Sequence, residues 1–481
     1  MKNLDSVRPP NPIKTANATD LAAPQESKTS AATISLLRPS QPKSFKWLLK
    51  LILGLIGLAV IILTTAVAWR AANLSDKIFV GTKTSFFQKI KEIIRGSSGD
   101  RMLIGESLGQ INILLLGIGG AGHEGPYLSD TMIIAQIRPD IGQVSLTSIP
   151  RDYLIELPQN LGLRKINSAF AEGFAKNQSY KEAGTWALDA AQKISGLAIP
   201  YFAVVDFVGF EKAIDQVGGI DINVEKSFTD SQFPDDKLGY LPPITFETGF
   251  EHMDGKRALQ FARSRHGTNG EGSDFARSQR QQKVISSLKN KVLSLNIISD
   301  AATINRLLGT FADHFHTNIG PGELFRLYKI AKDKNIHQFL SLSLDQETGL
   351  ICSKILEENG AFVLVPCPDK NEKDIQNFFK NSFAIGRMKA EKSVIWLGTS
   401  TEDKLTYQQA DKKLKEAGLI VWEVGFKGSP LSENIIYQVN PKPATVEFVK
   451  NSLNATEVTL PPPGIKVDAD KVDIIVILGK Q

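Results

Sequence analysis

Short apolar runs and segments of helical periodicity alternate along the middle of the chain. Three runs are typical of buried strands: residues 111–118, 131–137 and 143–149. Helices and strands are then expected in the order 180–194 (helix), 201–207 (strand), 209–217 (helix) and 219–224 (strand). This mixed order predicts an α/β sandwich with a mixed central sheet.

The pattern becomes mainly helical after residue 270. A long helix is expected from about 275 to Leu293, with Ser273 or Asp274 as its cap, and more helices reach about 335. Beyond them, "QFLSLSL", "AFVLVPC" and the closing "KVDIIVILG" are strand patterns. The expected units are a main domain at 105–335, an accessory α/β segment at 336–390 and a small C-terminal α/β domain at 391–481.

One apolar run near the N-terminus is longer than the others. Residues 51–68 carry no charge and, at about 1.5 Å per residue, are long enough to cross a bilayer core. We therefore expect a transmembrane anchor at 45–70. A cleaved signal peptide is the alternative, because Ala66-Val67-Ala68 resembles a processing site, but the run is longer than the apolar region of such peptides.

Lysines precede this run at positions 43, 46 and 50. The positive-inside rule then places the proline-rich residues 1–44, expected as a disordered tail, in the cytoplasm and everything after the anchor outside. Residues 71–104 are expected to form a helical stalk. The sequence thus predicts a single-pass protein of the cell membrane with its chemistry on the extracytoplasmic side.

Charge and cysteine content refine this interpretation. The net charge of +5 comes from 56 basic and 51 acidic side chains distributed along the 481 residues, which argues against a nucleic-acid partner. Cys352 and Cys367 both lie in the part expected to be exported, where they could form a disulfide or remain two buried thiols.

Gly117, Gly119 and Gly122 match the dinucleotide-binding pattern G-x-G-x-x-G after a strand. That pattern binds pyrophosphate only when a helix begins at its last glycine. Here the chain continues with "HEGPYLSDT" and another strand, so we reject a Rossmann site. What remains is a glycine loop at a strand end, either an ordinary connection or a place where backbone amides approach a ligand.

Polar residues stand at the ends of two expected strands. Asp130 precedes the strand that starts at Thr131, and it is either a ligand for a hard cation or an ordinary turn residue. Arg151 and Asp152 directly follow another strand and Pro150. Alone, such a pair is usually a surface ion pair of little energetic value.

The stretch "FARSRHGTNGEGSDFARSQRQQ" (261–282) concentrates arginines. Interpreted as a strand, "FARSR" places Arg263 and Arg265 on one face. On the helix that follows, Arg280 and Gln281 lie three and four residues after Arg277, near the helix N-terminus. Because the guanidinium fork suits phosphate oxygens, the cluster predicts a diphosphate ligand; several solvated arginines are the alternative.

A series of segments resembles the LytR-CpsA-Psr family, in order and with suitable spacing. They are "LLLG" (114–117), "SDT" (129–131), "SIPRD" (148–152), "KINSAFAEG" (165–173), "VDFVGFEKAIDQVGGIDI" (205–222), "MDGKRALQFARSR" (253–265) and "DFARSQRQQ" (274–282). The end of the chain, from 392, resembles the LytR C-terminal domain.

The resemblance implies an α/β/α sandwich and a membrane-anchored phosphotransferase. Such enzymes move a glycopolymer from a polyprenyl-pyrophosphate carrier to a peptidoglycan sugar hydroxyl, which makes lipid-linked glycan, peptidoglycan and the membrane the expected partners. The site residues it implies are Asp130, as ligand of Mg²⁺, and Arg151, Arg263, Arg265, Arg277 and Gln281 around the pyrophosphate; Arg280 belongs to the same cluster, and Asn167 and Asp152 would support it.

The chain departs from the family pattern at Gly119, where many members have an acidic residue. Either His123 or Glu124 takes over its role, or Asp130 works alone, so the general base stays unassigned. Two other functions fit the same residues: a hydrolase that uses water as acceptor, and a non-catalytic protein that binds the cell wall or lipid pyrophosphate.

Overall fold

The computed structural model describes residues 77, 80, 102–158, 161–235, 239–294, 313–334, 336 and 338–480. The expected tail, the expected anchor and nearly all of the expected stalk lie outside these residues. Within the described part of the chain, no helix has the length and apolar character needed to cross a membrane.

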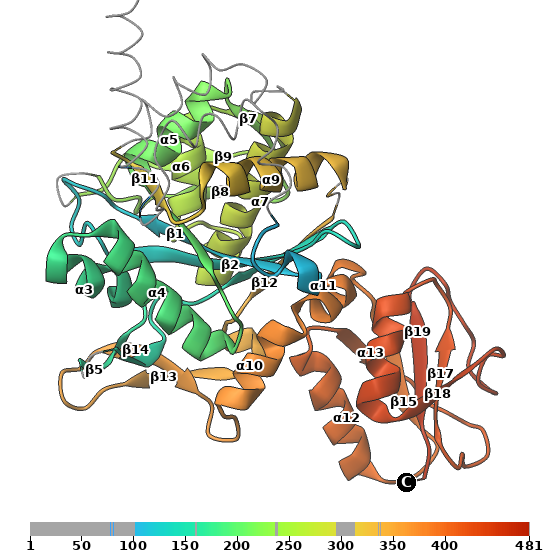
Figure 1. Ribbon diagram of the computed structural model, residues 1–481. Helices are drawn as coiled ribbons and strands as arrows, with labels where there is room; N and C mark the ends of the chain where they lie inside the picture. Colours follow the sequence, from blue (N-terminus) through green and yellow to red (C-terminus); the bar gives the residue numbers. More distant parts are fainter. Residues whose placement is uncertain are drawn as a thin grey trace, which may run out of the picture. The chain divides into compact units, whose positions relative to one another are not determined.

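A six-stranded mixed sheet forms the centre of the main domain (Figure 1). Its strands, in spatial order, are β11 (Phe315–Thr317), β6 (Tyr201–Asp206), β1 (Ile111–Ile118), β2 (Ser129–Arg138), β3 (Gln143–Ser148) and β12 (Gln338–Ser343). Strand β2 runs antiparallel to both β1 and β3, whereas β6 is parallel to β1 and β12 is parallel to β3. The predicted mixed sheet is therefore confirmed.

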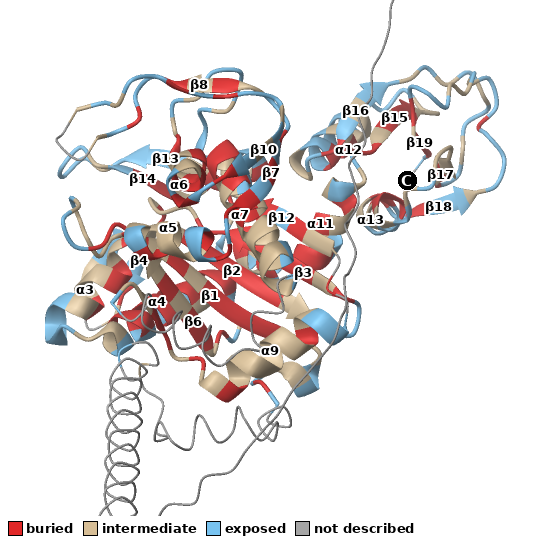
Figure 2. Ribbon diagram, turned by 90° about the horizontal axis from the view of Figure 1, so that it is seen from above, coloured by how far each residue is buried: buried red, intermediate tan, exposed pale blue. Residues whose placement is uncertain are grey.

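Much of this sheet is drawn in the colour of buried residues in Figure 2, and alternate side chains of β1 pack in two different cores, one on each face. Leu114 and Leu116 pack in a core with Phe170 of α3 and Ala187 of α4, on the face that α10 also covers. Ile113, on the other face, packs in a second core with Ile330 of α9, to which α7 also contributes. The helices are α3 (Ser168–Asn177), α4 (Tyr180–Ser195), α7 (Asp274–Ser294), α9 (Pro321–Asp333) and α10 (Glu372–Lys380). The result is the α/β/α arrangement that the resemblance implied.

A third hydrophobic core lies in the segment between β6 and α7 and includes Phe228, Phe246 and Phe261. Its elements are α5 (Phe207–Gln216), β7 (Ile220–Val224), β8 (Phe228–Asp230), β9 (Ile244–Phe246), β10 (Gly249–Met253) and α6 (Gly255–Arg263). This segment matters for function because it carries the first two arginines of the predicted cluster.

The segment 336–390, expected as an accessory unit, is part of the main domain. Its strand β12 is an edge strand of the central sheet, and Leu342, Phe378 and Phe379 belong to the same core as Leu114. Its other elements are η4 (Gln346–Thr348), the hairpin β13 (Ile351–Ile355) and β14 (Phe362–Pro366), and α11 (Ser382–Ala390). The cysteine pair left open by the sequence forms a disulfide, Cys352–Cys367, that ties the hairpin.

From Val394 onward the chain forms a second sheet of five strands with its own core around Leu397, Leu414 and Val476. The strands, in spatial order, are β16 (Ile420–Glu423), β15 (Val394–Thr399), β19 (Ile474–Leu478), β17 (Asn434–Gln438) and β18 (Ala455–Val458), with helices α12 (Lys404–Glu416) and α13 (Pro443–Leu453). The predicted α/β content is present; its assignment as a LytR C-terminal domain stays a prediction.

Candidate functional site

The topology brings the polar strand ends together at one edge of the central sheet. Because β2 is antiparallel to β1 and β3, its first residues lie beside the last residues of both neighbours, with Ile118 opposite Ser129 and Ser148 opposite Ile133. Arg151 follows β3 and donates a hydrogen bond from Nη1 to Oδ1 of Asp130 over 2.6 Å. Residues 21 positions apart thus form one ion pair at the sheet edge.

Asn167 and Asp152 hold this edge in place. The Asn167 carbonyl accepts a hydrogen bond from Ser129 N, and its own N–H donates to the Arg151 carbonyl, so its backbone joins the two strand ends. Asp152 accepts a hydrogen bond from Lys165 Nζ over 2.6 Å and lies 3.5 Å from Arg151 Nε. Both residues thus lie in contact with Arg151, and their supporting role in the site stays a prediction.

The prediction that "FARSR" is a strand was wrong. Residues up to Arg263 belong to helix α6, whose N-cap Asp254 accepts a hydrogen bond from Arg257 N. Its buried residues, Ala258, Leu259, Phe261 and Ala262, follow helical spacing. The pattern of two arginines flanking a serine reflects a helix end, not strand alternation.

The two arginines of this segment therefore lie in different surroundings. Arg263 stacks on Phe207, with its Cζ 4.0 Å from the ring centroid. Arg265, beyond the helix end, lies 3.4 Å from Oδ1 of Asp274. Both nevertheless line the same pocket as Arg151.

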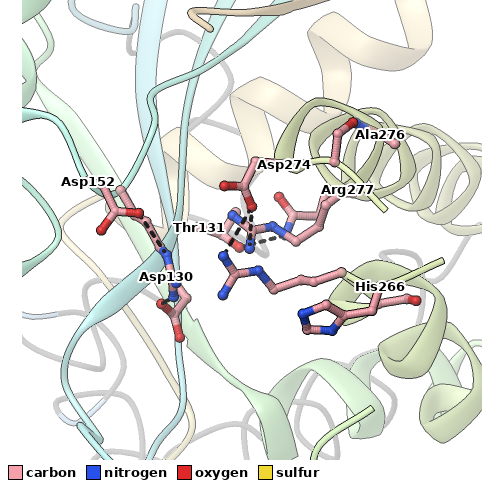
Figure 3. Close-up of polar contacts among 12 residues, drawn as sticks. Asp130, Thr131, Asp152, His266, Asp274, Ala276 and Arg277 are labelled. Carbon is pink, nitrogen blue, oxygen red and sulfur yellow. Dashed lines mark hydrogen bonds and ion pairs between the residues drawn. The ribbon is translucent and has the colours of Figure 1, made fainter. Parts of the chain in front are cut away.

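Helix α7 supplies the next arginine. Its first turn is capped by Ser273, whose side chain accepts a hydrogen bond from Ala276 N, as expected. Arg277 lies 3.0 Å from Asp274, and Gln281 donates to Thr131 Oγ1 over 2.9 Å, which joins the helix to β2. In Figure 3, Asp274 and Arg277 lie across from Asp130 and Asp152.

Arg280 does not join this group. Its Nε donates to the Phe261 carbonyl, its Nη2 to the Ser264 carbonyl and its Nη1 to Glu271, and only 3% of its side chain is exposed. It lines neither of the two pockets at the sheet edge. Of the two helix positions that follow Arg277, the structure therefore brings Gln281 to the site and turns Arg280 inward.

Arg277 is a buried cation with incomplete compensation. Burial lowers the pKa of Arg277 to about 10, and the neighbouring charges of Arg265 and Arg151 act in the same direction, against the attraction of Asp274. For Arg151, burial opposes the charged form, but Asp130, Asp152 and Asp274 together outweigh it and raise the pKa. Nε of Arg151 and Nε of Arg277 have no hydrogen-bond partner among the described residues. The arrangement favours an anion that reaches both guanidinium groups.

Two pockets meet at this cluster and form two arms of one cleft. The residues common to both are Asp130, Thr131, Arg151, Arg277 and Gln281. The β12 arm is lined in addition by Ser343, Asp345, Phe362 and Leu364. The α6 arm is lined in addition by Phe207, Tyr240, Arg263, Arg265 and His266.

The glycine loop behaves as expected for a chain without a dinucleotide site. It leads from β1 directly into the antiparallel β2, and no helix begins at Gly122. A Cβ added at Gly119 would lie 3.0 Å from Cβ of His123, whose ring packs edge-on against Phe207. The imidazole of His123 thus takes up space beside Gly119, where many family members have an acidic side chain.

Sequence reasoning missed several residues at the cleft. Thr131 and Lys165 are partners of predicted site residues, and Asp274, considered only as a helix cap, joins Arg265 to Arg277. Asp345 was missed because its segment was assigned to a separate unit. Its signal in the sequence is the same as that of Arg151: a charged residue directly after an apolar strand.

Comparison with known proteins agrees with the motifs. A family model described as the LytR_cpsA_psr family matches residues 76–373. The polyisoprenyl-teichoic acid–peptidoglycan teichoic acid transferase TagU of Enterococcus faecalis is 30% identical over 210 residues, covering 43% of this chain and 61% of that protein. The protein of the same name from Oceanobacillus iheyensis is 32% identical over 203 residues, covering 41% and 57%.

This chain thus spans about 60% of the length of these relatives. Among solved structures, protein gbs0355 from Streptococcus agalactiae is 24% identical, with 58% of this chain and 89% of that chain covered and a TM-score of 0.45. The family model covers well over half of the 481 residues. The chain belongs to the LytR_cpsA_psr family, as its motifs predicted.

Proposed function

We propose that this protein is a membrane-anchored, extracytoplasmic phosphotransferase. It moves a glycopolymer, as its sugar phosphate, from a polyprenyl-pyrophosphate carrier to a peptidoglycan sugar hydroxyl and releases polyprenyl phosphate. The names of the relatives support the reaction class, because they describe transfer of teichoic acid to peptidoglycan.

One observation carries the proposal: the buried Arg277 faces a cleft together with Arg151, and each has an Nε without a hydrogen-bond partner in the described part of the chain. A buried cation is unfavourable unless an anion compensates it. A diphosphate supplies several oxygens at the spacing that two or three guanidinium forks can contact. Catalysis would then rest on positioning and on neutralising charge at the transferred phosphoryl group.

Asp130 is suited to be a protein ligand of a Mg²⁺ ion that also binds phosphate oxygens. Its side chain is 44% exposed and lines both arms of the cleft, so a hydrated cation can reach it. No group of three or more potential metal-ligating side chains occurs among the described residues, so phosphate oxygens and water would complete the shell. Bound Mg²⁺ would neutralise charge on the diphosphate, while Arg151 orients the Asp130 carboxylate.

The test is product analysis with the full-length protein, a polyprenyl-pyrophosphate-linked saccharide and peptidoglycan. The proposal expects saccharide joined to peptidoglycan through a phosphodiester. Release of free saccharide phosphate without an acceptor would favour the hydrolase, and absence of any turnover would favour a binding protein.

Variants test the site assignment in the same assay. Arg151→Ala and Arg277→Ala should each lower the transfer rate by at least 100-fold, on the order of what one lost transition-state donor costs. Arg138→Ala is the matched control, since Arg138 forms an ion pair with Asp140 at the opposite end of β2. Normal transfer by both site variants would refute the assignment.

A further inference from the structure

The two arms of the cleft lie on opposite sides of the arginines. The β12 arm is on the side of β3 and β12, whereas the α6 arm is on the side of β6, because Phe207 directly follows that strand. Asp130 of β2 and Arg151, which follows β3, line both arms. A phosphoryl group held at the shared residues would therefore border both arms, which would leave separate room for the attacking and the leaving group of an in-line displacement.

Asp345 is placed at the β12 arm by the same geometry that places Arg151. Strands β3 and β12 are parallel, and Leu344 N donates to the Ser148 carbonyl, so the residues after both strands meet at one edge. The Asp345 side chain accepts a hydrogen bond from Thr348 N over 3.2 Å, which fixes its position as the cap of η4. Asp345 is one of the residues that line the β12 arm, as are Arg151 and Arg277.

The surroundings of Asp345 give it an unusual proton affinity. Burial raises its pKa to about 6, reinforced by Glu347 of η4 and opposed by Lys389 of α11 and by hydrogen bonds from Thr348 and Ser343. The charged groups on the other walls of the arm are Asp130, Arg151, Asp152, Asp274 and Arg277. At neutral pH the carboxyl is mainly ionised, yet it binds a proton more tightly than an ordinary aspartate, which suits a general base.

We propose that Asp345 is the general base of the reaction and that the acceptor sugar enters through the β12 arm. This inference rests on the proposed function. The acceptor hydroxyl oxygen forms a bond to the phosphorus that carries the glycan, while its proton passes to the Asp345 carboxylate. The bond between that phosphorus and the bridging oxygen breaks, and polyprenyl phosphate leaves with the electron pair on the side of the α6 arm.

This assignment supplies the general base that remained unassigned because residue 119 is a glycine. On the opposite side of the site, the His123 ring is packed against Phe207. Asp345 instead follows strand β12 and lies more than 60 residues after the last family motif, residues 274–282. The alternative is that Asp345 serves only as the cap of η4.

The deciding variant is Asp345→Asn, because an asparagine oxygen can still accept the hydrogen bond from Thr348 N. Asp403→Asn is the control, since Asp403 caps α12 through Leu405 N and Thr406 N in the same way but belongs to the C-terminal sheet region. Each full-length variant is assayed for transfer to peptidoglycan between pH 5 and pH 8, with thermal unfolding and stabilisation by pyrophosphate measured in parallel.

Asp345→Asn should lower kcat/KM at pH 7.5 by about 100-fold or more. The wild type should lose activity as the pH falls through about 6, and the variant should lack that limb. Pyrophosphate should stabilise both equally, and Asp403→Asn should match the wild type. Transfer by Asp345→Asn at the wild-type rate, or with the acidic limb retained, would overturn the role of Asp345 and leave the proposed function intact.

The proposed transfer reaction and the proposed role of Asp345 as general base can be refuted independently of each other. If the wild type releases saccharide phosphate to water and never to peptidoglycan, the transferase is refuted, and the acceptor assignment of the β12 arm with it. In that case, an equal loss of hydrolysis in Asp345→Asn would still support the base, whereas an unchanged rate of hydrolysis would overturn that part as well.

Discussion

Replacing Arg277 by glutamine should make the ligand-free protein more stable and abolish its response to pyrophosphate. Burial holds the pKa of Arg277 at about 10, so the folded protein binds that proton more weakly than the unfolded chain does. Burying the charged guanidinium group therefore lowers the free energy of unfolding. This loss of stability is fully present at any pH well below 10 and disappears only as the pH rises beyond that value. The drop in pKa corresponds to roughly 3 kcal/mol at neutral pH.

The glutamine side chain is shorter and loses part of the packing of the arginine stem, which costs about 1 kcal/mol. Asp274, which loses a partner, is 56% exposed and remains solvated. The free energy of unfolding of the full-length protein in urea should therefore rise by roughly 1–2 kcal/mol.

Pyrophosphate with Mg²⁺ tests the functional half of the same prediction. At a concentration 100-fold above the dissociation constant, the ligand should stabilise the wild type by about 2.7 kcal/mol and Arg277→Gln by much less. Arg138→Gln is the control: it removes an exposed ion pair with Asp140, so its stability should change by less than about 1 kcal/mol and its response to pyrophosphate should be retained. A variant destabilised by more than about 1 kcal/mol that still responds to pyrophosphate would refute the reasoning.

Three further changes have definite expected outcomes. Arg280→Gln should destabilise the protein by about 3–5 kcal/mol in urea unfolding, because it leaves the Glu271 carboxylate and three backbone carbonyls without their buried donor; a neutral effect would show that Arg280 is not structural. Replacing Cys352 and Cys367 together by serine should cost about 3 kcal/mol, as expected for a loop of 15 residues, and unchanged urea unfolding would contradict this. Asp345→Asn should be more stable than the wild type at pH 8 by up to about 3 kcal/mol and nearly equal to it at pH 4. The reason is that the raised pKa of Asp345 makes the wild type lose stability as the pH rises toward and through about 6. Equal stability of the two proteins at both pH values would contradict the burial of that charge.

The central strands were predictable because their signal is local. The run 111–118 is apolar except for Asn112 and coincides with β1, and the Pro139-Asp140 turn lies between β2 and β3 as expected. The cap at Ser273 was likewise predictable, since a serine before a helical pattern has a known preference. These features need no knowledge of distant contacts.

The sequence-based predictions failed where a segment fits both the helical and the strand period, or where residues far apart in the sequence come together. Five residues of "FARSR" match a strand as well as a helix, and only the longer pattern from Asp254 with its buried positions decides for α6. Arg280 and Gln281 are neighbours in sequence and lie about 100° apart around the helix, so only one of them can face the cleft, and the helical pattern alone does not say which. The parallel pairing of β12 with β3 joins positions nearly 200 residues apart, and no local pattern predicts that pairing.

The most direct measurement is the structure of the protein bound to a polyprenyl pyrophosphate and Mg²⁺. The account predicts the diphosphate oxygens within hydrogen-bonding distance of Arg151 and Arg277, the metal at Asp130, and the carboxyl group of Asp345 facing the phosphorus from the β12 arm. A diphosphate bound away from the shared part of the cleft, in contact with neither Arg151 nor Arg277, would contradict it.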